Sequence, residues 1–263
     1  MNKYLSLNLC ALCTYNFPLI SYKMQKFHTT YISSISEFTH QLETRISDKY
    51  RILLFRGQST DKSLIPNIAR HLFKKSREVD EKRMLEEFNI QSIQYLSYIP
   101  KNELEQLTIA QHYGLPTRLL DWTENALAAL YFAVCKESFS GDNAVVWVLS
   151  LERDSPLLIN DPNLKVFEQE ELKFFKPTSI IQRVSSQHGW FSLHPFKGQG
   201  FYERADQIFD GEYRLNKLVI KSGCSKKILQ TLESCGINRH TIFRDLDSLG
   251  TYIFEKYKFE KKD

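Results

Sequence analysis

The feature that most constrains the fold is the apolar run from Ala144 to Leu151, which contains Trp147. A strand of this composition must be covered on both faces, because it carries too few polar side chains to leave either face in water. Residues 141–143, Gly-Asp-Asn, turn the chain directly before it. The run therefore predicts a central strand of a β-sheet with other elements packed on both sides.

Several helices are predicted by capping residues and by apolar side chains at helical spacing. Ser34 and Glu37 form a capping box at the start of the first helix, which is expected to run to about Ser47. Asn102 begins another helix, and Gly114 supplies the left-handed residue that ends it. Similar patterns predict helices at residues 81–97, 225–235 and 245–257. The apolar residues expected to face inward on the last of these are Leu246, Leu249, Ile253 and Tyr257.

The segment PTRLLDWTENALAALYFAV, residues 116–134, carries a dense helical pattern. The helix is expected to begin near Asp121 or Thr123, with Glu124 completing a capping box. Small residues such as Ala129 and Ala133 flank its apolar stripe. Because small side chains allow close approach, this helix is expected to pack directly on the sheet.

The remaining patterns complete the predicted fold. Strands are predicted at residues 51–55, 179–184 and 217–221. Residues 154–177 are expected to be irregular, with one short helix. No repeat, low-complexity tract or linker divides the chain, so we predict a single α+β domain over residues 24–263, a mixed β-sheet flanked by helices. Residues 1–23 are expected to be an N-terminal extension that is dispensable for folding and function.

The charge and the cysteine content exclude several classes of protein. Thirty-five basic against 31 acidic residues leave a formal charge of +4, which is too small an excess to predict nucleic-acid binding. Five cysteines are an odd number without the spacing of a disulfide framework or of a four-ligand metal site, which fits a reducing cytoplasm. No stretch reaches the length of a membrane span. We expect a cytoplasmic protein that uses no metal ion and no membrane.

The sequence LFRGQ places a cation where a buried strand is expected to end. Arg56, Gly57 and Gln58 directly follow the apolar residues from Ile52 to Phe55. An arginine is a long bidentate donor, and a glycine behind it lets another backbone or a ligand approach closely. Arg56 therefore either stabilises the fold or binds an anion.

A second arginine, Arg118, follows Thr117 at the start of the alanine-rich segment. Two arginines at element ends, with glycine and threonine beside them and a helix N-terminus nearby, suit a phosphate or a diphosphate. The alternative for either arginine is a structural ion pair, with Asp121 or Asp245 as the carboxylate.

Other polar or aromatic residues are candidates for chemistry. His112 is a candidate general base, with a helix cap or a packed ring as the alternative. Trp122 has the ring needed to stack on a base, although most such residues fill a core. Candidate ligands of a divalent ion, with helix capping as the alternative, are Asp121, Asp245 and Asp247.

These residues carry a resemblance to a known family. The motif from Phe55 to Gln58, the block LTIAQHYGLPTRLLDWTENALAALYFAV at residues 107–134 and the sequence QHGWF at residues 187–191 resemble the FRG domain family, named for Phe-Arg-Gly. The closing segment GINRHTIFRDLDSLGTYI is also similar, so the resemblance extends over residues 31–259. FRG proteins are largely uncharacterised bacterial and phage proteins, so the resemblance implies little about activity.

A more distant similarity extends to ADP-ribosyltransferases. In that family an arginine that closes the first strand contacts the phosphate and ribose of NAD, and a Ser-Thr-Ser segment leads into an alanine-rich helix. Arg56 and the segment at residues 116–133 are similar to these two motifs, which places Thr117 at the central threonine and Arg118 at a serine position. Gln187 lies where the transferases have a glutamate that holds the nicotinamide ribose. The similarity implies an ADP-ribosyltransferase-like fold, NAD as the cofactor and Gln187 as a catalytic position.

Three functional hypotheses follow, of which the third is hydrolysis of nucleic acid with Asp121, Asp245 and Asp247 around a divalent ion, for which no paired-carboxylate spacing is found. In the first, the domain binds NAD or another phosphate-bearing nucleotide and, if active, cleaves the nicotinamide bond as an ADP-ribosyltransferase or NAD glycohydrolase, with Gln187 and His112 as catalytic residues. In the second, it is a non-catalytic module that binds nucleic acid or a partner protein in a bacterial defence or mobile-element system, and the polar clusters are structural. The residues that bind the nucleotide in the first hypothesis are Arg56, Gly57, Gln58, Thr117 and Arg118.

Overall fold

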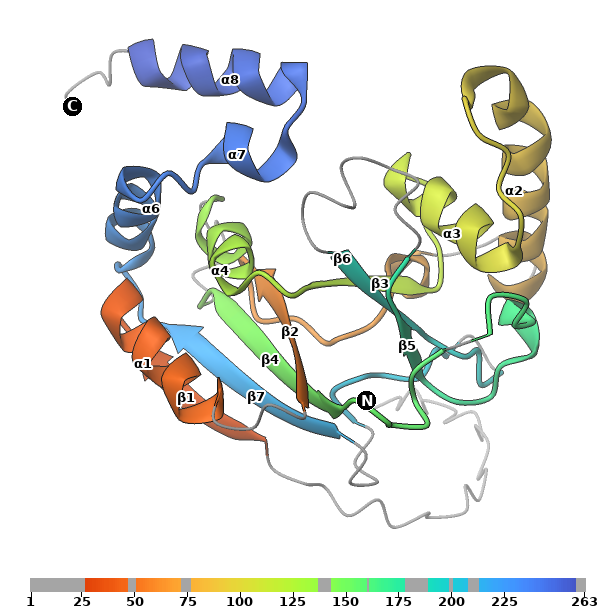
Figure 1. Cartoon of the computed structure of the whole chain (residues 1–263), viewed down its shortest axis with the longest axis horizontal. Coiled ribbons are helices and arrows are strands. Elements are labelled where there is room, and N and C mark those ends of the chain that lie inside the picture. Colours follow the sequence, from red (N-terminus) through yellow and green to blue (C-terminus); the bar gives the residue numbers. More distant parts are fainter. Residues whose placement is uncertain are drawn as a thin grey trace, which may run out of the picture.

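Seven strands of the described residues form one mixed sheet, which confirms the predicted α+β fold (Figure 1). The computed structural model describes residues 27–46, 51–71, 77–136, 143–159, 161–177, 189–198, 201–207 and 213–258. The strand order is β1-β7-β4-β2-β3-β6-β5, in which only the β1–β7 pair is parallel. The strands are β1 (His28–Ile32), β2 (Arg51–Gln58), β3 (Leu119–Thr123), β4 (Val145–Glu152), β5 (Lys173–Phe175), β6 (Gly189–Leu193) and β7 (Tyr213–Ile220).

Helices pack on this sheet and on one another around three apolar clusters. One cluster lies between the sheet and α1, α4, α6 and α7, and another lies between α2, α3 and the strands β3, β5 and β6. The third covers the opposite face of the sheet and is built around Trp147 and Trp122. The helices are α1 (Ile35–Ile46), α2 (Arg77–Ser92), α3 (Glu103–His112), α4 (Ala126–Val134), α6 (Ser225–Ser234), α7 (Arg239–Phe243) and α8 (Leu246–Tyr257).

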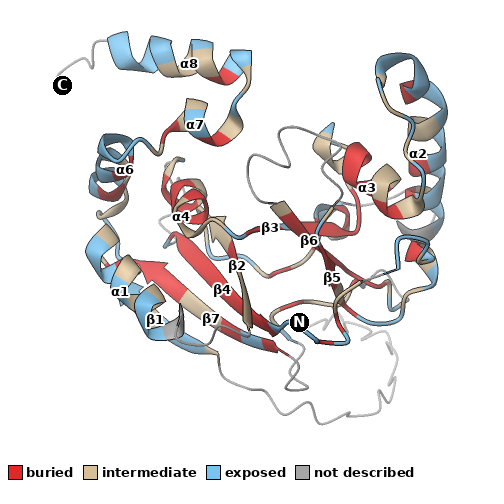
Figure 2. Ribbon diagram, in the orientation of Figure 1, coloured by how far each residue is buried: buried red, intermediate tan, exposed pale blue. Residues whose placement is uncertain are grey.

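The strand β4 lies at the centre, as the apolar run predicted. It pairs with β2 on one side and with β7 on the other. Every residue from Val145 to Leu151 is buried, which Figure 2 shows as a continuous buried strand. Alternate side chains enter the two clusters on opposite faces, so both faces are covered.

The sheet is almost divided in two between β2 and β3. These strands pair at a single register position, Phe55 with Thr123. By contrast, β2 pairs with β4 along its whole length, and β3 pairs with β6 along its whole length. The residues of β2 that follow Phe55 and the residues of β3 that precede Thr123 therefore separate, and an opening forms at this place in the sheet.

The helix α4 approaches β2 so closely that only a glycine fits between them. A Cβ atom at Gly57 would lie 1.8 Å from the backbone oxygen of Ala129 and 2.8 Å from the backbone nitrogen of Ala133. The small residues of α4 thus allow the close approach that the sequence predicted. The glycine of the Phe-Arg-Gly motif is required by helix packing rather than by backbone conformation.

Two boundaries beside this contact differ from the prediction. The strand β2 continues to Gln58 instead of ending at Phe55, because β4 supplies a partner for every residue. Asp121 lies within the strand β3 and does not begin a helix. The helix begins only at Ala126, where Asn125 caps it by accepting a hydrogen bond from the backbone N–H of Ala128 at 3.0 Å.

Other differences lie where local patterns compete with tertiary pairing. The predicted inward stripe of α8 is wrong, because the side chains of Leu246, Ile253 and Tyr257 are exposed. The helix lies at the periphery and packs mainly on α7. The strands β1, β3, β5 and β6 were not predicted, and α2 lies a few residues earlier than expected. The strand predicted at residues 179–184 lies outside the described residues.

The described helices differ clearly from membrane-spanning segments. None of them combines the length and the apolar character that crossing a bilayer requires.

Replacing Gly57 with Ala is expected to lower the free energy of unfolding by about 3 kcal/mol, because the new methyl group would force α4 away from the sheet. The measurement is urea denaturation followed by circular dichroism. Gly250→Ala is the matched control, since Gly250 lies within α8 with open space around its α-carbon. That change should raise the stability slightly through helix propensity. A Gly57→Ala protein as stable as the unsubstituted protein would contradict the assigned packing role.

Candidate functional site

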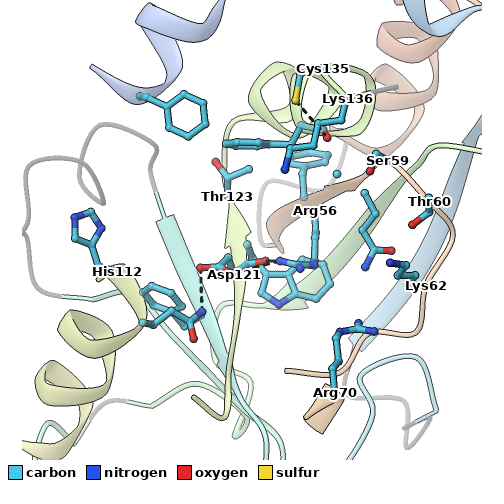
Figure 3. A pocket seen from close by; sticks show the side chains of 18 residues that line it. Arg56, Ser59, Thr60, Lys62, Arg70, His112, Asp121, Thr123, Cys135 and Lys136 are labelled. Atoms are coloured by element: carbon cyan, nitrogen blue, oxygen red, sulfur yellow. Dashed lines mark hydrogen bonds and ion pairs between the residues drawn. The ribbon is translucent and has the colours of Figure 1, made fainter. Parts of the chain in front are cut away.

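A cavity of about 550 Å³ opens where β2 and β3 separate (Figure 3). Its walls come from residues 55–60 of β2 and the segment after it, from residues 121–123 of β3, and from the C-terminal ends of α3 and α4. A volume in this range is usual for a small-molecule site. A second cavity of about 310 Å³ adjoins it and shares the lining residues Arg56, Arg70, Gln111 and Asp121.

Arg56 lies at the centre of this cavity and is held mainly by a backbone group. Its Nη1 donates a hydrogen bond to the backbone oxygen of Asp121 at 2.7 Å and lies 3.6 Å from Oδ2 of the same residue. Its Nε is buried and has no hydrogen-bond partner among the described residues. Burial lowers the pKa of the guanidinium, and the nearby Asp121 and Arg70 act in opposite directions. The protein therefore compensates this charge only in part.

Three more cations, Lys62, Arg70 and Lys136, line the same cavity. Arg70 donates to the backbone oxygen of Ser63 at 2.8 Å. Among the described ion pairs, none joins Lys62 or Lys136 to a carboxylate. Since Asp121 is the one acidic residue among the described residues of the lining, the cavity is electropositive.

Aromatic rings form another part of the wall. Phe132 of α4 and Phe243 of α7 are half-buried and meet edge to face, with ring centroids 5.7 Å apart. Trp122 and Phe191 also line the cavity. A ligand that combines anionic groups with a flat ring would find a complementary surface for each.

Several of the predicted site residues lie together here. Arg56, Gly57 and Gln58 line the cavity, and His112 lies on the wall opposite Lys62 and Arg70 (Figure 3). Gln58 accepts a hydrogen bond from Nε1 of Trp147 at 3.1 Å. The cavity thus contains the Phe-Arg-Gly-Gln segment and the candidate general base. The other candidate catalytic residue, Gln187, lies outside the described residues.

Thr117 and Arg118 do not line this cavity. The Arg118 side chain is buried, and its Nη2 lies 2.7 Å from Oε2 of Glu81. Its Nη1 donates to the backbone oxygen of Val166 at 3.3 Å. The Thr117 hydroxyl is also buried and donates to Oε1 of Gln111.

The sequence had predicted that the two arginines converge on one ligand. In the structure they do not. Arg118 forms the structural ion pair that was the alternative, but its partner is Glu81 and not Asp121 or Asp245. The guanidinium also lies over the ring of Phe167, with 4.4 Å to its centroid. Charge, hydrogen bonds and ring contact together satisfy Arg118 inside the core.

The aspartates considered as metal ligands have different structural roles. Asp245 caps α8 by accepting a hydrogen bond from the backbone N–H of Ser248 at 2.7 Å. Asp121 projects from β3 beside Arg56. In the part of the chain that the structure describes, no group of three or more His, Cys, Asp or Glu side chains is placed to hold a metal ion.

A buried hydrogen-bond chain behind the cavity was not predicted. Trp122 Nε1 donates to the hydroxyl of Ser192 at 2.9 Å, and Ser192 lies 2.9 Å from Nε2 of His194. His194 Nδ1 lies 2.6 Å from the backbone oxygen of Glu203. Because a carbonyl only accepts, Nδ1 carries the proton and Nε2 accepts from Ser192. Alternating apolar and polar residues at 191–194 were a sequence signal for the strand but not for its partner Trp122.

Comparison with known proteins gives one finding of similarity. The FRG domain family model matches residues 51–141. The chain carries an FRG domain. The match covers about a third of the chain, less than the range 31–259 over which the sequence resembles the family. Searches of curated proteins and of solved structures found no similar protein.

The FRG domain match contains nearly the whole wall of the cavity. Of the lining residues described above, only Phe191 and Phe243 lie outside it. The three residues of the motif have three different tasks. Phe55 packs in the core under α4, Arg56 lines the cavity, and Gly57 allows the close approach of α4 to β2.

Replacing Glu81 with Gln in the FRG domain is expected to lower the free energy of unfolding by about 3–5 kcal/mol, because Arg118 would keep a buried charge without its counter-ion. Urea denaturation measures the change. Glu171→Gln is the control, since it removes the exposed partner of Lys173 and should cost at most about 1 kcal/mol. Equal losses in the two proteins would show that Arg118 does not depend on Glu81.

His194 is expected to make the stability depend on pH. Burial lowers its pKa from 6.5 to about 4, while the hydrogen bond to Glu203 acts in the opposite direction. Between these values the unfolded chain binds a proton that the folded protein does not. The stability is therefore complete above about pH 6.5 and is lost as the pH falls toward 4, by on the order of 3 kcal/mol in total.

The measurement is the free energy of unfolding of the unsubstituted protein and of His194→Gln at several pH values between 7 and 4.5. Carboxylates contribute to the pH dependence of stability in both proteins. The difference between the two slopes of unfolding free energy against pH therefore isolates the contribution of the His194 imidazole. We expect a smaller slope for His194→Gln. Identical slopes would mean that His194 titrates alike in the folded and unfolded states.

Proposed function

We propose that the FRG domain binds a phosphate-bearing nucleotide, NAD-like in its chemistry, in the cavity between β2 and β3. The observation that carries this proposal is Arg56, whose guanidinium is largely buried, donates to one backbone oxygen and lies 3.6 Å from the carboxylate of Asp121. Its Nε is buried and has no hydrogen-bond partner among the described residues. A phosphate oxygen hydrogen-bonded to the Arg56 guanidinium would supply the missing negative charge.

The other cations support a ligand with more than one negative charge. Lys62 and Arg70 follow β2 in sequence, and Lys136 lies at the end of α4. All of them surround Arg56 in the cavity (Figure 3). Because the net charge of the chain is only +4, this concentration of cations is local and not a property of the whole surface. A diphosphate would contact several of these groups at once.

The size and the aromatic lining favour a nucleotide over inorganic phosphate. The rings of Phe132 and Phe243 provide an apolar surface for a planar base or a nicotinamide. The adjoining smaller cavity shares Arg56, Arg70 and Asp121 with the larger one, so these two arginines lie between two spaces. A dinucleotide, with two ring systems joined by a diphosphate, matches this arrangement.

Cleavage of the nicotinamide bond is a further step within this proposal. His112 remains the proposed general base, since it lies on the wall of the cavity. The thiol of Cys135 is a poor nucleophile because burial raises its pKa. Incubation with NAD followed by chromatography tests the step. Release of nicotinamide would support a transferase or glycohydrolase, and intact NAD would leave a binding domain.

A non-catalytic interaction module is the second candidate, and one observation favours it. The helix α8 exposes the apolar side chains of Leu246, Ile253, Phe254 and Tyr257. Exposed apolar residues on one helix are typical of a surface that contacts a protein. In this hypothesis Arg56 is structural and a partner in a bacterial defence or mobile-element system is bound elsewhere.

Arg56→Ala separates the two candidates. If Arg56 binds a phosphate, the variant should stay folded, with a loss of about 1–2 kcal/mol for the hydrogen bond to Asp121. It should bind NAD and ADP-ribose at least about tenfold more weakly, as measured by isothermal titration calorimetry. Arg51→Ala is the matched control, because Arg51 lies at the other end of β2, pairs with Glu152 and does not line the cavity.

Two outcomes would count against nucleotide binding. One is the absence of binding heat from the unsubstituted protein with NAD, ADP-ribose and ATP at millimolar concentration. The other is an Arg56→Ala protein that fails to fold while Arg51→Ala folds normally, which would assign Arg56 to the architecture.

A further inference from the structure

Asp121 is the one carboxylate among the described residues that line an otherwise cationic cavity. It lies in the middle of β3, where Leu120 and Trp122 on either side are buried, but its own side chain is 63% exposed. The neighbouring backbone is therefore fixed while the carboxylate remains accessible. An accessible carboxylate beside a group that binds anions needs a reason, because it weakens the attraction for an anion.

Neutralising Arg56 is not a sufficient reason. The close contact between the two residues, at 2.7 Å, is made by the backbone oxygen of Asp121. The carboxylate is farther away, at 3.6 Å, which is beyond a good hydrogen bond. Any residue at this position would offer Arg56 the same backbone oxygen.

The carboxylate is instead oriented by a neutral group. Gln111 Nε2 donates a hydrogen bond to Oδ1 of Asp121 at 3.1 Å (Figure 3). Gln111 is itself fixed, because its Oε1 accepts a hydrogen bond from the buried hydroxyl of Thr117. This relay from the core holds the carboxylate on the wall, with unused acceptor positions on both oxygens. Both cavities reach it.

An oriented carboxylate within a few ångströms of a phosphate site discriminates between ligands by charge and by hydrogen bonding. It accepts hydrogen bonds from hydroxyl groups and repels a second phosphate at the same place. In a nucleotide, the vicinal hydroxyls of the ribose are the donors nearest to the phosphate. The ligand class that satisfies both Arg56 and Asp121 is therefore a nucleotide with a phosphate on one side of the sugar and free ribose hydroxyls on the other.

We propose that Asp121 is the residue that determines sugar specificity in this cavity. It accepts hydrogen bonds from the 2′- and 3′-hydroxyls of a ribonucleotide and excludes nucleotides that lack these hydroxyls or carry a phosphate on them. The inference rests on the proposed nucleotide site and adds a preference that the cations alone would not give, because Arg56, Lys62, Arg70 and Lys136 would favour the more highly charged ligand.

The test uses three probes, each with a single ribose or ribose analogue: ADP, 2′,3′-dideoxy-ADP and adenosine 2′,5′-bisphosphate. Their dissociation constants are measured by isothermal titration calorimetry with the full chain, with Asp121→Asn and with Glu124→Gln. Glu124 is the matched control, because it is an acidic residue close to Asp121 in sequence that pairs with Lys176 and does not line the cavity.

We expect the unsubstituted protein and Glu124→Gln to bind ADP about tenfold more tightly than either analogue, as a lost hydrogen bond or a repelled charge would give. In Asp121→Asn the preference over the bisphosphate should disappear, because the repelling charge is gone. The affinity for ADP itself need not fall, since the backbone contact to Arg56 is retained. Thermal melts confirm that all three proteins are folded.

The outcomes separate this inference from the proposed function. If no probe binds to the unsubstituted protein, the nucleotide site fails and the role of Asp121 fails with it. If all three probes bind with equal affinity, the nucleotide site stands and the sugar preference is wrong. If the preference for ADP over the bisphosphate persists in Asp121→Asn, another group excludes the 2′-phosphate, which also overturns the assignment.

Discussion

The separation of β2 from β3 beyond Phe55 and Thr123 is the constraint on which the rest of the site depends. Each strand keeps a full-length partner on its other side, so the opening leaves the pairing in the rest of the sheet intact. Arg56 then replaces a missing strand-to-strand hydrogen bond by donating to the backbone of Asp121. The cavity is therefore a consequence of the sheet topology, and the motif residues fit an opening that the strands create.

Two arginines of the same FRG domain show how burial and partners decide a role. Arg118 meets a carboxylate, a backbone oxygen and two aromatic rings, so its charge is satisfied inside the core. Arg56 meets one backbone oxygen and a distant carboxylate, and desolvation lowers its pKa. Both residues lie at positions that a sequence pattern treats alike. What distinguishes them is Glu81, which lies in a helix far from Arg118 in the sequence.

The sequence predicted those parts of the structure that depend on neighbouring residues. The central strand from Val145 onward, the cap at Asn102 and the stop at Gly114 rely on local composition, and the structure confirms them. Asp121 was placed at a helix start because its pairing with β6 depends on residues much later in the chain. Arg56 and His112 were identified as candidate site residues and line one cavity, whereas the cations Lys62 and Lys136 that surround them carry no motif.

The pairing of β1 has a consequence for the order in which the chain assembles during synthesis. Within the described residues β1 lies at an edge of the sheet and pairs only with β7, in parallel. A ribosome therefore releases the first strand long before its partner exists. The FRG-matched segment emerges in between, and β2 gains its full-length neighbour β4 only after that segment is complete. Until β7 appears, a nascent chain has an incomplete sheet with open edges, a stage at which association with other chains competes with folding.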